Sequence, residues 1–182
     1  MSVFEYIILA FVMAIPTMIT VRGCALKNPI RLTRGLAVSF LLAFEHALLL
    51  IFGIITGNVL QFDLPEYDNL ICLGMLLVVA GRMFFFAFSK KDRPSYDIAN
   101  WPTVMLLGIA TGINVLFVGL GLGFRVQVSD ELWKASIPLL VIIFLLTYLG
   151  IMLGRRKKKI RTRRWMLLGV LLLLVFAVRC IL

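Results

Sequence analysis

The chain has 182 residues, of which 62% are hydrophobic and 15% are charged, and its formal net charge is +10. The apolar fraction exceeds that of an average soluble domain, so the composition excludes a soluble protein and favours an integral protein of the lipid bilayer. The net charge alone would also suit a nucleic-acid-binding protein, but the basic residues lie in short connections between apolar stretches. We therefore predict no nucleic-acid partner.

Six apolar stretches of about 20 residues each are long enough to cross a bilayer as helices. The predicted spans, in chain order, are Val3–Val21, Gly35–Gly57, Leu70–Phe88, Pro102–Phe124, Trp133–Gly154 and Trp165–Leu182. The first span carries Glu5 and lacks a basic leading region, so we interpret it as a retained helix and not as a signal peptide. Because the spans take up nearly the whole chain, we predict one all-α transmembrane domain over residues 1–182.

The charges of the connections predict the orientation of this domain in the membrane. The connections at residues 22–34, 89–101 and 155–164 are rich in basic residues, whereas the one after the second span carries Asp63 and Glu66 and no basic residue. Basic connections stay in the cytoplasm, so both termini are expected outside. The run Arg155–Arg164 has a second interpretation, which is binding of anionic lipid headgroups.

The two halves of the chain resemble each other. A shift of 97 or 98 positions places the first three spans on the last three. The matched residues include Leu9 and Leu107, Gly53 and Gly150, Gly57 and Gly154, and Arg82 and Arg179. Each unit, residues 1–89 and 100–182, holds three spans, so the second unit must enter the membrane from the opposite side. This predicts a 3+3 inverted repeat, the plan of many secondary transporters, whose substrate site lies at mid-membrane between the halves. Chance matches between apolar stretches are the alternative.

Glu45 is the one acidic residue inside an apolar stretch, and the single histidine, His46, follows it. Charged groups at bilayer depth are costly and usually face a bundle interior or a wet cavity, where they bind ions or carry protons. The sequence therefore predicts a functional site at Glu45. The alternative is a protonated carboxyl group that hydrogen-bonds to a neighbouring helix and has only a structural role.

The repeat makes Pro16 and Asn114 equivalent, and both lie near the middle of their spans. Pro16 lacks an amide donor, which frees a carbonyl group one turn earlier, and Thr17 follows it. Thr111 lies three residues before Asn114, on the same helical face. With Glu45, these groups are expected to supply oxygen ligands at one depth, with Glu45 and Asn114 as the metal ligands. A proline kink and a glycine-rich helix contact without any ligand are the alternative.

Several short segments carry a family resemblance that spans the whole chain. They are Leu9-Ala10-Phe11-Val12-Met13, Phe44-Glu45, Gly81-Arg82-Met83, Ile109-Ala110-Thr111, Val118-Gly119-Leu120-Gly121 and Leu149-Gly150-Ile151-Met152-Leu153-Gly154-Arg155. Their order and spacing resemble the manganese efflux pump family (MntP), small six-helix proteins of the bacterial inner membrane within the lysine exporter superfamily. The family has aspartates at the positions held here by Pro16 and Asn114, and an acid at that of Phe86. Of these four acidic positions, only Glu45 keeps its charge.

The resemblance implies a multi-pass transporter of the bacterial inner membrane that exports a divalent cation such as manganese, with no resident cofactor. Alternating access between the halves is the expected mechanism, and the expected ligands are Glu45, Asn114, Thr111, Thr17 and the carbonyl groups freed by Pro16. We expect Arg82 and Arg179 near opposite ends of their helices, either reaching the membrane interfaces or pairing at a gate.

The alternative function is a non-transporting membrane protein that keeps the transporter scaffold. We expect no enzyme. Cys72 and Cys180 do not occupy equivalent repeat positions, as a thiol relay would need, and the sequence shows no second intramembrane acid, no metal-binding histidine pair and no GxSxG motif. The oligomeric state is left open.

Overall fold

The computed structural model describes residues 3–62, 67–88, 96–125, 128–156 and 162–179, with the backbone alone for 128–131 and 162. These residues form six α-helices and no strand. The helices are α1 (Val3–Lys27), α2 (Leu32–Gln61), α3 (Asp68–Phe88), α4 (Trp101–Gly123), α5 (Val128–Arg155) and α6 (Thr162–Arg179). The prediction of an all-α protein with six helices is confirmed.

The first helices are longer than their apolar stretches. The first connection shrinks from the predicted residues 22–34 to residues 28–31, because α1 continues to Lys27 and α2 begins at Leu32. Two causes act here. Cys24 and Ala25 are buried in the core, so the extra turns gain packing, and Pro29 disfavours helical backbone at the residue before it, which ends α1.

Five of the described helices are long and apolar enough to cross a membrane. These are α1 to α5, with α5 counted from Leu132. The remaining helix, α6, contains Arg163, Arg164 and Arg179 within its 18 residues, and the last residues of its predicted span lie outside the described part of the chain. The fold is that of a multi-pass membrane protein.

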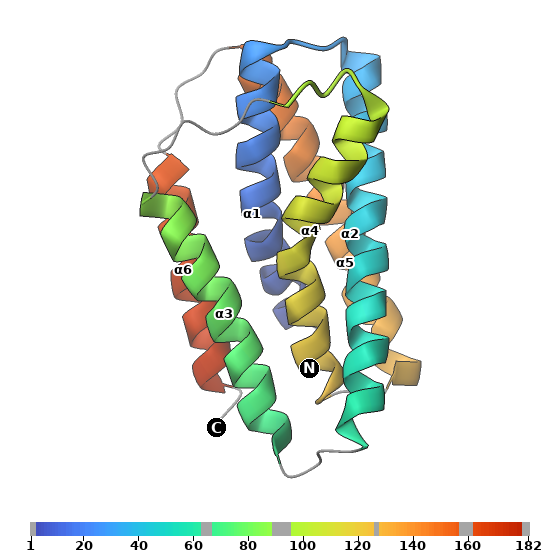
Figure 1. Cartoon of the computed structure of the whole chain (residues 1–182), viewed down its shortest axis with the longest axis vertical. Helices are drawn as coiled ribbons and strands as arrows, with labels where there is room; N and C mark the ends of the chain where they lie inside the picture. Colours follow the sequence, from blue (N-terminus) through green and yellow to red (C-terminus); the bar gives the residue numbers. More distant parts are fainter. Residues whose placement is uncertain (1–2, 63–66, 89–95, 126–127, 157–161, 180–182) are drawn as a thin grey trace.

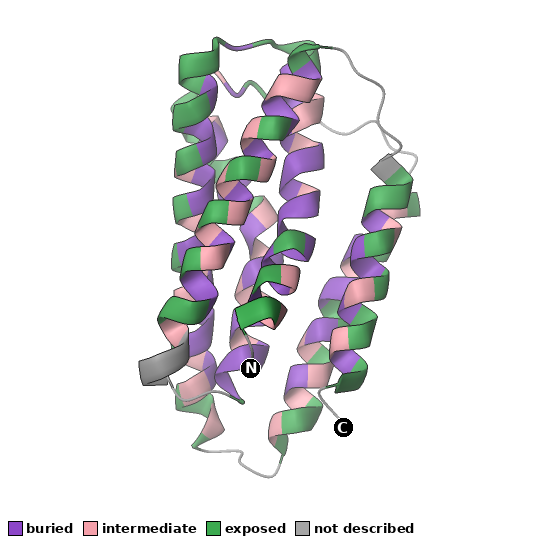
Figure 2. Ribbon diagram, turned by 180° about the vertical axis from the view of Figure 1, so that it is seen from behind, coloured by how far each residue is buried: buried purple, intermediate pink, exposed green. Residues whose placement is uncertain are grey.

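Four helices form a tight group, and two others pair beside it. Figure 1 shows α1, α2, α4 and α5 packed together, with α3 and α6 alongside and successive helices antiparallel. The helices turn their buried residues toward one another and their exposed residues outward (Figure 2). The outward residues are large and apolar, such as Phe52 and Phe85, as a surface in contact with lipid requires.

The first turn of α1 and the last turn of α6 lie at the end of the bundle where α2 is followed by α3 (Figure 1). These two helix ends are on the same side, as the alternating connections predict. That this side faces outward stays a prediction, and much of the basic connections 89–101 and 155–164 lies outside the described residues.

The helix contacts are symmetric between the halves. The contacting pairs are α1 with α5, α2 with α4, α2 with α5, α3 with α6, α3 with α4, α1 with α6 and α1 with α4. If α1 is exchanged with α4, α2 with α5 and α3 with α6, every one of these pairs maps onto itself or onto another pair. This is the pattern that a structural repeat would produce.

Glycines set the closest contacts in both halves. A Cβ atom at Gly53 would lie 2.6 Å from the Leu116 carbonyl oxygen, and one at Gly150 would lie 2.6 Å from the Met18 carbonyl oxygen. Only glycine lets the backbones approach so closely. A turn later the contact recurs, with Gly57 against Leu120 and Gly154 against Arg22. The partners match at the shifts of 97 and 98 that align the two halves.

Alanine at Gly57 or Gly154 should therefore lower the thermal unfolding midpoint of the detergent-purified protein, because the new methyl group overlaps a neighbouring backbone. The cost expected for such overpacking is about 1–3 kcal/mol. Gly74 is the matched control, since nothing lies within 4 Å of a Cβ added there. Gly74→Ala should leave the midpoint unchanged or raise it, because alanine favours helix. Equal midpoints for Gly57→Ala and Gly74→Ala would contradict this account of the packing.

Candidate functional site

His46 is the point where α1, α2 and α4 meet. Its ring is fully buried, and Nδ1 lies 2.6 Å from the carbonyl oxygen of Leu42. A carbonyl oxygen can only accept a hydrogen bond, so Nδ1 carries a proton. The other ring nitrogen, Nε2, lies 3.1 Å from Oγ1 of Thr17 and 3.3 Å from Oγ1 of Thr111. In the neutral ring, Nε2 accepts hydrogen bonds from these hydroxyl groups, so one imidazole links three helices.

Thr111 joins this polar centre to a cavity. Its Oγ1 lies 2.8 Å from the carbonyl oxygen of Leu107, one turn earlier on α4, and the same side chain lines the cavity. A hydroxyl group has a single proton. When Thr111 donates that proton to Leu107, it cannot also donate to His46, and its lone pairs stay available to a molecule in the cavity.

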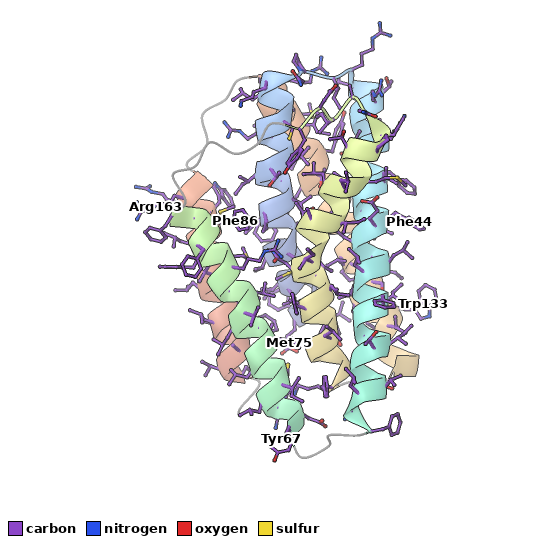
Figure 3. All side chains as sticks on the ribbon, viewed as in Figure 1. Phe44, Tyr67, Met75, Phe86, Trp133 and Arg163 are labelled. Carbon is purple, nitrogen blue, oxygen red and sulfur yellow. The ribbon has the colours of Figure 1, made fainter. Side chains whose placement is uncertain are left out.

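The cavity has a volume of about 210 Å³ and lies between α1, α3, α4 and α6. Its polar lining consists of Thr20, Arg82, Tyr96, Thr111 and Asn114. Its apolar lining consists of Pro16, Met83, Phe86, Leu107, Ala110 and Met166. Figure 3 shows Phe86 on α3 where that helix faces α1, whereas Phe44 and Trp133 point away from the bundle. Pro16, Phe86 and Asn114, the three positions at which the resemblance implies acidic residues in the family, line this cavity together.

Pro16 does not end α1, which continues for 11 further residues to Lys27. The hydroxyl group of Thr20 donates to the Pro16 carbonyl oxygen at 2.8 Å. This bond stabilises the turn after the proline.

Arg82 lies on the cavity wall. Its Nη2 donates to the carbonyl oxygen of Ala110 on α4 at 3.2 Å, and its guanidinium group lies 5.9 Å from the centre of the Phe86 ring. We expected this side chain near a helix end, at an interface or a gate. It reaches a backbone carbonyl group of α4 beside the cavity because the arginine side chain is long and its fork of donors suits such an acceptor.

Arg179 forms an ion pair with Glu5, which joins the last turn of α6 to the first turn of α1. Glu5 was not among the partners predicted for this arginine. The sequence could have predicted this ion pair, because two termini on one side of the membrane bring the start of α1 and the end of α6 to the same depth. Arg82 and Arg179 thus make equivalent connections, one from α3 to α4 and the other from α6 to α1.

Glu45 lies apart from the cavity. Its carboxylate packs against Gly108 of α4, and Oε2 is buried without a hydrogen-bond partner among the described residues. Asn114, which is 5% exposed, also has an unpartnered oxygen, Oδ1, but it lines the cavity. Asn114 lies six positions after Gly108, which places the two residues about 120° apart around α4.

The structure therefore brings together only part of the predicted ligand set. Pro16, Thr111 and Asn114 share the cavity, and Thr17 is linked to Thr111 through His46. Within the described ranges, no group of three or more histidine, cysteine, aspartate or glutamate residues is placed to hold a metal ion. Joint metal binding by Glu45 and Asn114 stays a prediction.

Sequence reasoning missed His46 as the central residue and treated it only as the neighbour of Glu45. Helical geometry could have separated the two residues, because consecutive residues on a helix point about 100° apart and must face different neighbours.

Of the cysteines, Cys24 and Cys72 are buried and form no disulfide, and Cys180 lies outside the described residues.

Helices of this length and hydrophobicity define a multi-pass membrane protein. Residues 29–181 match the sequence model of the family described as "Putative manganese efflux pump", so the chain belongs to that family. The resemblance found in the sequence is confirmed. Family membership also agrees with the expectation of a bacterial membrane transporter and not an enzyme.

Proteins that carry the same family name, MntP, are similar to this chain. That of Syntrophotalea carbinolica is 30% identical over 61% of this chain and 58% of its own length. Those of Methanocorpusculum labreanum and Aliarcobacter butzleri are 25% and 26% identical, over 86% and 94% of this chain and 82% and 95% of their own lengths. No solved structure matches the chain.

The polar centre predicts the effect of removing its hydroxyl groups. Thr17→Val and Thr111→Val should each destabilise the protein by about 0.5–1.5 kcal/mol, because each removes a hydrogen bond to His46. The double variant should depart from additivity, since both hydroxyl groups share one nitrogen. Thermal unfolding of the purified protein measures this. Thr56→Val is the control, because the Thr56 hydroxyl group donates within its own helix, to Phe52. A control as destabilised as Thr17→Val would rule out the interhelical role.

Proposed function

We propose that the protein is a secondary transporter that exports a divalent cation of the manganese type across the bacterial inner membrane. The observation that carries the proposal is the cavity, which is lined by α1 and α3 from one half and by α4 and α6 from the other. A site between two halves with equivalent helix contacts suits alternating access, in which the halves move against each other around the substrate. The description of the family and the names of the relatives support the choice of manganese.

The proposed ligands are oxygen atoms, which hard cations such as Mn²⁺ prefer. Glu45 supplies the charge or carries a proton, and Asn114, Thr111 and Thr17 supply neutral oxygens, together with the carbonyl groups freed by Pro16. In the described conformation, Glu45 faces the α2–α4 contact and Asn114 faces the cavity. We propose that movement of α4 against α2 brings them together in another state of the transport cycle.

Two arginines would control access to the site. Arg179 pairs with Glu5 at the end of the bundle that holds the termini, and Arg82 binds α4 beside the cavity. Release of either contact would let the α3–α6 pair separate from the four-helix group. A gating role for these residues follows from the helices that they connect.

The proposed orientation places both termini outside and the segment 155–164 in the cytoplasm, where it would also contact anionic lipids. A cysteine introduced at position 63 should react with an impermeant thiol reagent from outside intact cells, and one at position 160 should not. External labelling of position 160 would contradict the orientation.

A second candidate function is a membrane protein that keeps the scaffold without transporting a cation. The observation in its favour is that the cavity lining includes no carboxylate among the described residues. Expression in a manganese-sensitive bacterium that lacks its own exporter separates the two. Restored growth in high manganese selects the transporter, and failure of a well-expressed protein selects the scaffold.

In the same assay, Glu45→Gln should abolish manganese tolerance while leaving folding intact, because the substitution removes the charge and keeps the shape. Arg155→Gln is the control and should keep tolerance at the parent level, since Arg155 is exposed at the end of α5. Tolerance that survives in Glu45→Gln would show that Glu45 has a structural role.

The double variant Pro16→Asp with Asn114→Asp should raise manganese tolerance above that of the parent. Both positions line one cavity, so the two added carboxylates repel each other unless a cation binds between them. Mn²⁺ should accordingly raise the unfolding temperature of the variant more than that of the parent. A folded double variant with neither effect would show that the two positions do not form a cation site.

A further inference from the structure

The charge of the cavity is opposite to the one that a bare cation needs. Arg82 is the one charged side chain among the described residues that line it, and Glu45 packs elsewhere, against Gly108. A divalent cation held near Arg82 by neutral oxygens alone would be repelled, and the low dielectric of the site strengthens that repulsion. An anion would be attracted for the same reason.

Arg82 has the donors to bind an anion. A guanidinium group carries five N–H donors, and one contact, from Nη2 to the Ala110 carbonyl oxygen, is seen in the described structure. The side chain is half-buried, which strengthens a charge-assisted hydrogen bond relative to one in water. Guanidinium and carboxylate groups match as a bidentate pair.

The size and walls of the cavity suit a small organic molecule. Its volume of about 210 Å³ exceeds the roughly 150 Å³ of an apolar cavity that holds benzene. Met83, Phe86, Leu107 and Met166 supply apolar surface next to Arg82. An anion with a short carbon skeleton would use both kinds of wall, whereas a bare inorganic anion would use only Arg82.

Asn114 supplies an independent indication of a ligand. It is 5% exposed, and its Oδ1 is buried in the cavity wall without a hydrogen-bond partner among the described residues. A buried acceptor without a partner is costly. An electropositive group would satisfy it, and a metal ion bound to a carboxylate is such a group.

We propose that the cavity binds a small carboxylate through Arg82, and that a divalent cation enters together with this anion and takes Oδ1 of Asn114 as a neutral ligand. The carboxylate supplies the negative charge that the lining lacks. The part that concerns the cation deepens the proposed function and rests on it, whereas binding of the carboxylate stands on the cavity alone.

Thermal unfolding of the full-length protein in a neutral detergent tests the binding of the anion. Malonate, inorganic phosphate and chloride are compared at equal ionic strength and pH. Malonate should raise the unfolding midpoint by about 2 °C or more relative to chloride, and phosphate should not. No malonate effect, or an equal effect of phosphate, would overturn the carboxylate proposal.

Substitutions test whether the stabilisation by malonate arises from binding in the cavity. Arg82→Gln should lose the response to malonate, and Arg163→Gln should keep it, because Arg163 is exposed on α6 and stacks on Phe88 outside the cavity. Ala110→Leu keeps Arg82 but fills the cavity, and it should also lose the response. This second variant decides the matter if Arg82→Gln does not fold. A response that persists in either folded cavity variant would refute the site.

Mn²⁺, added with and without malonate at equal free Mn²⁺ concentration, tests the cation. Mn²⁺ should add stabilisation only when malonate is present, and Asn114→Leu should keep the malonate effect and lose the manganese effect. Equal stabilisation by Mn²⁺ alone would overturn the joint entry of cation and anion. Manganese tolerance in cells without a malonate effect would refute this inference and leave the proposed function standing. A malonate effect without manganese tolerance would refute the proposed function and leave the binding of the carboxylate standing.

Discussion

The close backbone contact at the glycines of α2 and α5 is the constraint on which the rest of the structure depends. Helices in lipid gain little from burying apolar surface against one another, so their association relies on close packing and on polar contacts. Gly57 lets α2 pack closely against α4, and Gly154 lets α5 pack closely against α1. With these distances fixed, His46 comes within hydrogen-bonding reach of Thr17 and Thr111. The polar centre is therefore a product of glycine packing.

The polar groups of the interior are divided by α4. One side of this helix faces Glu45 and His46 of α2, and the other faces the cavity with Arg82. Thr111 is in contact with both sides. The carboxyl group of Glu45 and the guanidinium group of Arg82 thus contact different faces of one helix, at Gly108 and at Ala110.

Much of the fold could be predicted from the sequence, whereas the faces of the helices could not. Length and hydrophobicity gave the spans. Gly53 and Gly150, which the internal match relates, both pack closely against a neighbouring backbone, and Pro16 and Asn114 line one cavity. The inverted repeat itself stays a prediction. Residues that face lipid are as apolar as residues in the core, so composition did not reveal which side of a helix points inward. Phe85 is exposed, and Met83, two residues earlier, is buried. For the same reason, the sequence did not show that Glu45 turns away from the cavity or that Arg82 turns toward it.

The pairing of α3 with α6 has a mechanical consequence. This pair takes one helix from each half of the chain and contacts the four-helix group through α4 on one side and α1 on the other. The pair is thus attached to the four-helix group at two places of the same kind. In the proposed transport cycle, a tilt that loosens α6 from α1 would press α3 toward α4, so the two attachments would not loosen together.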